Sequence, residues 1–175
     1  MTKLVLTVVG IDRPGLVEAL STALDSHEGN WLESEFLHLA GQFAGIALVD
    51  VPGEQTARFS DAVAALQDAI GLRVTVTPAE DHTAEGPATG ASVPVRLHLL
   101  GQDRPGVVRQ VTSALATEHV TIQEFSSWTR PAPEGGGTLF EAESIVQLPE
   151  GTDASVIREA LEPIAAELMV DLEVE

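Results

Sequence analysis

The chain has 175 residues, of which 44% are apolar, so it can bury one sizeable core or two small ones. Nine basic residues stand against 27 acidic ones, which gives a formal net charge of −18, and cysteine is absent. This balance argues against direct binding to nucleic acid or to an anionic membrane surface. The lack of cysteine excludes disulfides, thiolate nucleophiles and cysteine-ligated zinc.

The N-terminal segment contains an apolar run that is too short for a signal peptide and reaches an acidic residue at Asp12. No apolar run approaches the roughly 20 residues that are needed to span a bilayer. We therefore expect a cytoplasmic protein without a membrane segment.

A six-residue motif occurs twice and organises the chain. Residues 10–15 read Gly-Ile-Asp-Arg-Pro-Gly, and residues 101–106 read Gly-Gln-Asp-Arg-Pro-Gly, 91 positions later. Each copy follows an apolar run typical of a strand and precedes a segment with the apolar spacing of a helix. The same strand, turn and helix start is therefore expected in two related units.

The apolar pattern predicts the order β-α-β-β-α-β in each half of the chain. The expected elements of the first half are 4–9, 16–24, 31–39, 43–51, 54–69 and 72–77. Those of the second half are 95–100, 107–115, 121–129, 139–148, 153–168 and 169–174. Glu33 and Glu35 disturb the alternation of the second strand, which leaves a β-bulge open there.

Residues 78–92 are rich in Pro, Gly and small polar residues, so they are interpreted as a linker between domains 1–77 and 93–175. Each domain is expected to be a ferredoxin-like sandwich of the α+β class. Right-handed crossovers place the strands of its antiparallel four-stranded sheet in the order 4-1-3-2, with both helices on one face.

The residues of the motif suit the start of a helix that meets a ligand. Gly10 is expected to let the backbone leave the strand at dihedral angles that a side chain resists, and Pro14 suits the first helical turn. Gly15 keeps that turn bare, so that the amides near Leu16 point out of a positively polarised helix terminus. Asp12 either caps these amides or takes the amino group of a ligand. A single copy taken alone is better explained as a helix entry without any ligand.

A β-α-β-β-α-β unit with Gly-x-Asp-Arg-Pro-Gly at its first strand–helix junction resembles the ACT domain, a small regulatory module that binds amino acids. Residues 29–34 resemble the start of the family's second strand, where an apolar residue follows Asn. Two such units in tandem, and the residues 41–43, resemble the glycine cleavage system transcriptional repressor group.

The resemblance implies a sensor of glycine or a similar small amino acid, with sites where the first junction of one unit faces strand two of its partner unit. By position, the first site comprises Gly10, Asp12, Arg13, Pro14, Gly15, Leu16 and Asn30, and the second comprises Gly101, Asp103, Arg104, Pro105, Gly106 and Val107. The match breaks at Thr121, the counterpart of Asn30, so the second site is expected to be weaker or lost if Asn30 contacts ligand. The implied partner is a separate DNA-binding regulator protein, no cofactor is implied, and a homodimer is left open.

Three other readings stay open beside the sensor. Repeated carboxylates at Asp12, Asp103, Glu33 and Glu124 suit acid–base catalysis, but they occupy equivalent rather than convergent positions, so we expect no enzyme. The five histidines lack the paired spacing of metal ligands, so we expect no metal site. A ligand-free interaction module is the third reading, and it predicts partner binding without any dependence on an amino acid.

Overall fold

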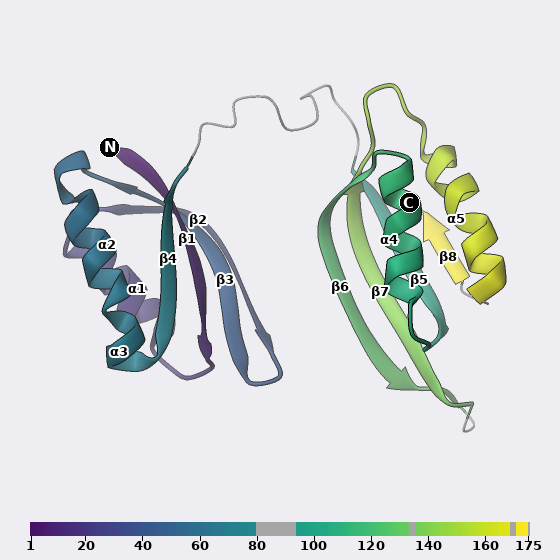
Figure 1. The fold of residues 1–175 in the computed structure, drawn as a ribbon, viewed down its shortest axis with the longest axis horizontal. Helices are drawn as coiled ribbons and strands as arrows, with labels where there is room; N and C mark the ends of the chain where they lie inside the picture. The colour runs from purple at the N-terminus through teal and green to yellow at the C-terminus, as the bar shows by residue number, and fades with distance from the viewer. Residues whose placement is uncertain (80–93, 134–135, 169–170, 175) are drawn as a thin grey trace. The chain divides into compact units, whose positions relative to one another are not determined.

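The computed structural model describes residues 1–79, 94–133, 136–168 and 171–174, with side chains as far as residue 164 (Figure 1). The chain divides into two compact units, Met1–His82 and Thr83–Glu175. Most of the predicted linker, 78–92, lies outside the described residues, and Pro78 belongs to the last strand of the first unit.

The first unit has the predicted order of strands and helices. Its elements are β1 (Thr2–Ile11), α1 (Leu16–Asp25), β2 (Asn30–Leu39), β3 (Gln42–Val51), a 3₁₀ turn η1 (Gly53–Gln55), α2 (Thr56–Ala64), α3 (Leu66–Ile70) and β4 (Leu72–Pro78). The strands pair antiparallel in the order β2-β3-β1-β4, which confirms the predicted 4-1-3-2.

The second unit repeats this topology. Its elements are β5 (Val95–Gln102), α4 (Val107–Thr117), β6 (Thr121–Pro131), β7 (Thr138–Gln147), α5 (Ala154–Leu168) and β8 (Asp171–Val174). The strand order β6-β7-β5-β8 is the same arrangement, so the prediction of two α+β, ferredoxin-like units is confirmed.

One predicted helix, 54–69, is wrong in detail, because the structure divides it into η1, α2 and α3. The break lies at Ala65, whose ψ of −18° is closer to a 3₁₀ than to an α-helical value. The amide of Asp68 donates to the Ala65 carbonyl over three residues at 3.2 Å, which tightens the chain locally. Apolar periodicity continues across this break and therefore does not reveal it.

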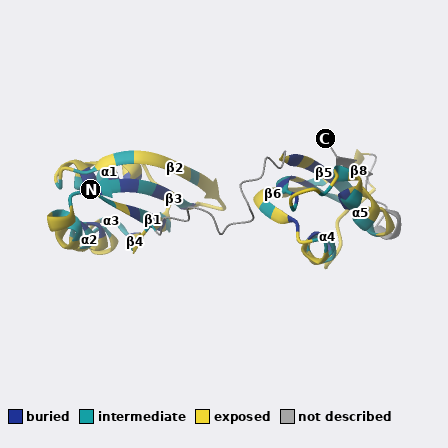
Figure 2. Ribbon diagram, turned by 90° about the horizontal axis from the view of Figure 1, so that it is seen from above, coloured by how far each residue is buried: buried dark blue, intermediate teal, exposed yellow. Residues whose placement is uncertain are grey.

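Each unit buries its core between one sheet face and the helices that cover it (Figure 1). In the first unit, alternate β1 residues and every fourth α1 residue are buried, because these positions share one face of their element. The buried residues of these two elements are Leu4, Leu6, Val8, Leu16, Leu20 and Leu24. The opposite sheet face carries no helix, and β2 is exposed along most of its length (Figure 2).

A β-bulge decides which β2 side chains face the helices. The register between β2 and β3 shifts between Trp31 and Glu33, so the bulge that the sequence left open is present. The extra residue, Leu32, turns Glu33 and Glu35 to the helix-free face, opposite Leu48 and Ile46 of β3. A register shift at the same point of β6, between residues 122 and 124, repeats this device in the second unit.

Candidate functional site

Both copies of the motif form the same junction between a strand and a helix. Gly15 is the N-cap of α1 with φ 94° and ψ 0°, and Gly106 is the N-cap of α4 with φ 95° and ψ −5°. A β-carbon is disfavoured at these dihedral angles, which explains the glycine. In neither described junction does a side chain cap the helix, so the first-turn amides face outward without an acceptor from a capping residue.

Two expectations for the motif are wrong. Pro14 and Pro105 lie before the N-cap glycines and outside the helices, because the chain first needs a left-handed residue to turn into each helix. Gly10 does not leave its strand: it pairs with Phe43 and Leu72 within β1. A β-carbon at Gly10 would lie 2.9 Å from the Gly71 carbonyl oxygen, so close backbone approach requires this glycine.

Asp12 does not cap the amides of α1, and the structure shows where its carboxylate goes instead. Its Oδ1 lies 3.1 Å from Nε2 of His38, near the end of β2, and its backbone amide donates to the Gly41 carbonyl at 3.0 Å. The register explains this contact, because Ile11 and His38 both lie next to the start of β3. The pair is well exposed, so a ligand can reach the carboxylate.

Arg13 lies against the turn between α3 and β4. A β-carbon added at Gly71 would be 2.8 Å from Nη2 of the Arg13 side chain, and Gly71 itself has φ 66°. Arg13, Gly10 and Gly71 are therefore brought together at the end of the sheet where α1 begins.

Asn30 and Glu33 lie at the far end of the same sheet from Asp12. Asn30 pairs with Asp50, which in turn pairs with Lys3, seven residues before Gly10. At a rise of about 3.3 Å per residue, this is a separation of about 23 Å. The structure does not bring Asn30 to the junction of its own unit, and Glu33 and Asp12 do not form one acidic site.

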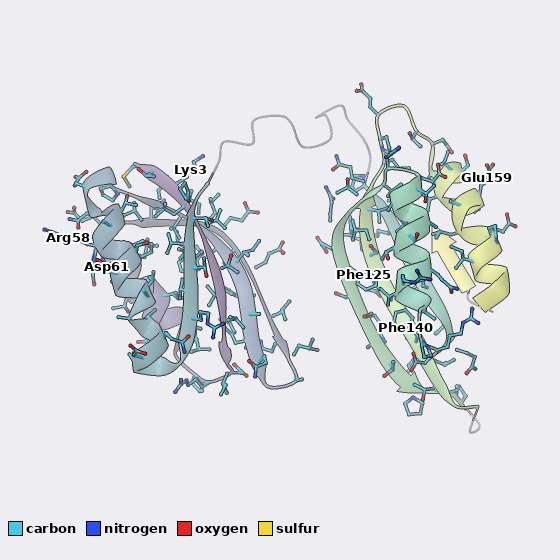
Figure 3. All side chains as sticks on the ribbon, in the orientation of Figure 1. Lys3, Arg58, Asp61, Phe125, Phe140 and Glu159 are labelled. Carbon is cyan, nitrogen blue, oxygen red and sulfur yellow. The ribbon has the colours of Figure 1, made fainter. Side chains whose placement is uncertain are left out.

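The second junction opens onto a depression of about 530 Å³. Its lining residues are Asp103, Arg104, Gly106, Val107, Val108, Arg109, Thr112 and Phe140, the last of which is labelled in Figure 3. Gly101 pairs with Phe140 within the sheet, as Gly10 pairs with Phe43. The amide of Asp103 donates to the Thr138 carbonyl at 2.9 Å, as that of Asp12 donates to Gly41.

The two junctions differ at one position that the sequence did not single out. His38 stands opposite Phe43, and Thr129 stands opposite Phe140 at the corresponding place of the second unit. Asp12 therefore has a histidine beside it where Asp103 has a threonine on the equivalent strand. The predicted strand order could have revealed this difference. It places the end of the first strand and the end of the second strand on either side of the third.

The helix-free face of the second unit carries a polar network that sequence reasoning also missed. The Glu141 carboxylate accepts hydrogen bonds from Arg130 Nε at 2.8 Å and Trp128 Nε1 at 3.2 Å, and its other oxygen lies 3.0 Å from His98 Nε2. The Arg130 hydrogen bond, and after it that of His98, holds the pKa of Glu141 below its usual value.

The described residues offer neither a candidate metal site nor a candidate membrane span. No group of three or more His, Cys, Asp and Glu side chains there is arranged to hold a metal ion. Nor does that part of the chain contain a helix of the length and apolarity required to cross a membrane.

Comparisons with known proteins agree with the fold. Residues 2–77 match the ACT domain family. The chain is 24% identical over 170 residues to the glycine cleavage system transcriptional repressor of Escherichia coli (strain K12), covering 94% of this chain and 85% of that protein. A solved structure of an unknown protein from Galdieria sulphuraria is 29% identical, with a TM-score of 0.85, and the match covers 99% of this chain and 97% of that one. A candidate glycine cleavage system transcriptional repressor shares the fold at 16% identity, with a TM-score of 0.72 over 99% of this chain and 96% of that one.

Proposed function

We propose that this chain is a regulatory ACT-domain protein that binds a small amino acid, because residues 2–77 match the ACT domain family and the chain is similar to the glycine cleavage system transcriptional repressor. Glycine or a close relative is the proposed ligand. The proposed action is in the cytoplasm, on a separate DNA-binding regulator, through contact between the two proteins. A net charge of −18 favours a protein partner over DNA.

The observation that supports this proposal is the pairing of an uncapped helix start with a carboxylate at each junction. The first-turn amides of α1 and α4 offer donors and a positive dipole end to a ligand carboxylate. Asp12 follows β1 and Asp103 follows β5, each four residues before the first residue of the next helix, and each offers a negative charge to a ligand ammonium group. An α-amino acid carries both charged groups on one carbon atom, so its ammonium and carboxylate groups together match such a junction.

Ligand binding at the first junction competes with a contact within the protein. An ammonium group that binds Asp12 displaces His38 from the carboxylate, so the end of β2 loses this contact. Any partner that contacts this end of the sheet then binds the two states with different affinity, which is the condition for regulation by a ligand. Asn30 is proposed to act only at the junction of another unit, because it lies far from its own.

A ligand-free interaction module is the second candidate, and the Asp12–His38 pair also favours it. In that case His38 stays in contact with the Asp12 carboxylate in every state of the protein, and partner binding is independent of any amino acid.

The test is a thermal-shift screen of the full chain against the twenty amino acids. A ligand that binds only the folded state stabilises it by RT ln(1 + [L]/Kd), about 2.7 kcal/mol at a hundredfold excess over Kd. Asp12→Ala and Asp103→Ala are expected to reduce the shift, whereas Asp61→Ala, which removes an exposed carboxylate of α2, leaves it unchanged. No shift with any amino acid at millimolar concentration supports the ligand-free module instead.

A further inference from the structure

The helix-free face of the first unit is unusually apolar for a surface. Exposed large apolar side chains gather on it at the end where β1 and β2 finish: Val9, Ile11, Leu37, Leu39 and Ile46. Ile11 and Leu39 are the most exposed of these, at 67% and 71%. The name outer face is used below for this helix-free side of the β2-β3-β1-β4 sheet.

The register makes these side chains one continuous patch. Ile11 and Leu39 lie on either side of Gln42, and in the next row Val9 and Leu37 lie on either side of Ala44. Alternate residues are about 6.7 Å apart along β1 and along β2, and these two strands lie about 9.6 Å apart across β3, where Ala44 and Ile46 connect the two rows. A patch of this kind on a protein surface marks an interaction site.

We infer that the outer face docks the outer face of a second copy of this chain, with the two sheets packed face to face about a twofold axis parallel to the strands. Such an axis lays β2 of one copy over β4 of the other. The contact is isologous, since each copy uses the same surface twice.

Charge at the two edges of the outer face fits this axis. Glu33 and Glu35 project from β2 at one edge, and Arg73 projects from β4 at the other, opposite Val9 of β1. The proposed axis therefore sets the acidic edge of each copy against the Arg73 edge of its partner. Two such pairings flank the apolar patch, which is the arrangement of a polar rim around an apolar centre.

The size of the sheet is sufficient for a stable dimer. Three strands of ten residues and one of seven, about 4.8 Å apart, cover roughly 600 Å² on each copy. The pair buries about 1,200 Å², at the lower end of specific protein–protein interfaces.

The corresponding face of the second unit is a poor chemical match for this patch. Arg96, His98, Glu141 and Glu143 take positions that Val5, Thr7, Ala44 and Ile46 hold in the first unit. Covering these groups with apolar side chains would remove charge from water, and the apolar patch offers no polar partner in exchange. The outer face of the first unit in a second copy is equally apolar, which favours a second copy of this chain as the occupant.

This inference is independent of amino-acid binding, and its test is the association state of the full chain. Sedimentation velocity over a concentration series is expected to show a reversible dimer. Ile11→Glu and Leu39→Glu are expected to raise the dimer dissociation constant by about tenfold or more each, because they place charge in an apolar contact. Both side chains are exposed in one copy, so the thermal midpoint of the monomer is expected to persist.

Two controls identify the occupant. Val108→Glu replaces an exposed apolar residue, 41% accessible, on α4 of the second unit and is expected to leave the dimer intact. Glu35→Arg and Arg73→Glu are each expected to weaken the dimer, and the double variant to restore it. A chain that is monomeric at every concentration overturns the inference, as does a dimer that survives both patch substitutions. A dimer that Val108→Glu disrupts as strongly also overturns it.

Discussion

The two N-cap glycines allow the construction of the junctions to be tested in energy units. In Gly106→Ala, the new β-carbon meets no atom within 4 Å, so the cost is that of the left-handed backbone alone. That cost is about 1–2 kcal/mol. Alanine also restricts the unfolded chain, which offsets part of the cost, so the free energy of unfolding is expected to fall by about 1 kcal/mol. Gly15→Ala is expected to lose the same amount, because its nearest contact, Glu18 Oε2 at 3.8 Å, is ordinary.

Differential scanning calorimetry of the full chain is the assay for both variants. A loss of 1 kcal/mol lowers the midpoint of a unit of this size by about 4–8 °C. Gly53→Ala is the matched control, because the φ of Gly53 is not positive and a β-carbon there meets only Thr2 Oγ1, at 3.7 Å. Unchanged or raised midpoints in both Gly15→Ala and Gly106→Ala would refute the left-handed cap at the start of these helices.

Two further predictions concern the polar contacts of the sheets. His38→Ala is expected to tighten amino-acid binding at the first junction by up to about fivefold, since an exposed contact of this kind with Asp12 is worth about 0–1 kcal/mol. Thr129→Ala is expected to change nothing, and weaker binding in His38→Ala on calorimetric titration contradicts the competition. Glu141→Gln is expected to lower the midpoint at pH 7, because the pKa of Glu141 is depressed by Arg130 and the charged form is the stabilising one. The stabilisation by ionised Glu141 is present above the ordinary pKa of 4.5 and is lost as the pH falls through the lower pKa of the folded state. The thermal midpoints of wild type and Glu141→Gln are therefore expected to converge in acid. A difference between the two midpoints that persists in acid contradicts the stabilising role of the Glu141 carboxylate.

The fold was largely predictable because its determinants are local and occur twice. Alternating residues such as Leu4, Leu6 and Val8 reveal a half-buried strand, and the repeated motif sets the period of the whole chain. The division of the second helix at Ala65 was not predictable, because the apolar spacing is the same on both sides of the break.

The candidate site was less predictable because it depends on contacts between residues distant in sequence. The motif places Asp12 at a helix start, where a cap is the local expectation, but the sheet register offers it His38 instead. Likewise, the position of the β2 bulge decides whether Leu37 and Leu39 face the helices or the outer face. A one-residue shift reverses that choice, so the apolar outer face becomes visible only in the structure.

The most direct test of the proposed function is calorimetric titration of the full chain with glycine, alanine and serine. The wild type is expected to release or absorb heat with at least one of them, and the Asp12→Ala/Asp103→Ala double variant to bind that ligand at least about tenfold more weakly with an unchanged thermal midpoint. Equal binding by the double variant, or no heat from the wild type at millimolar amino acid, would contradict an amino-acid site at the two junctions.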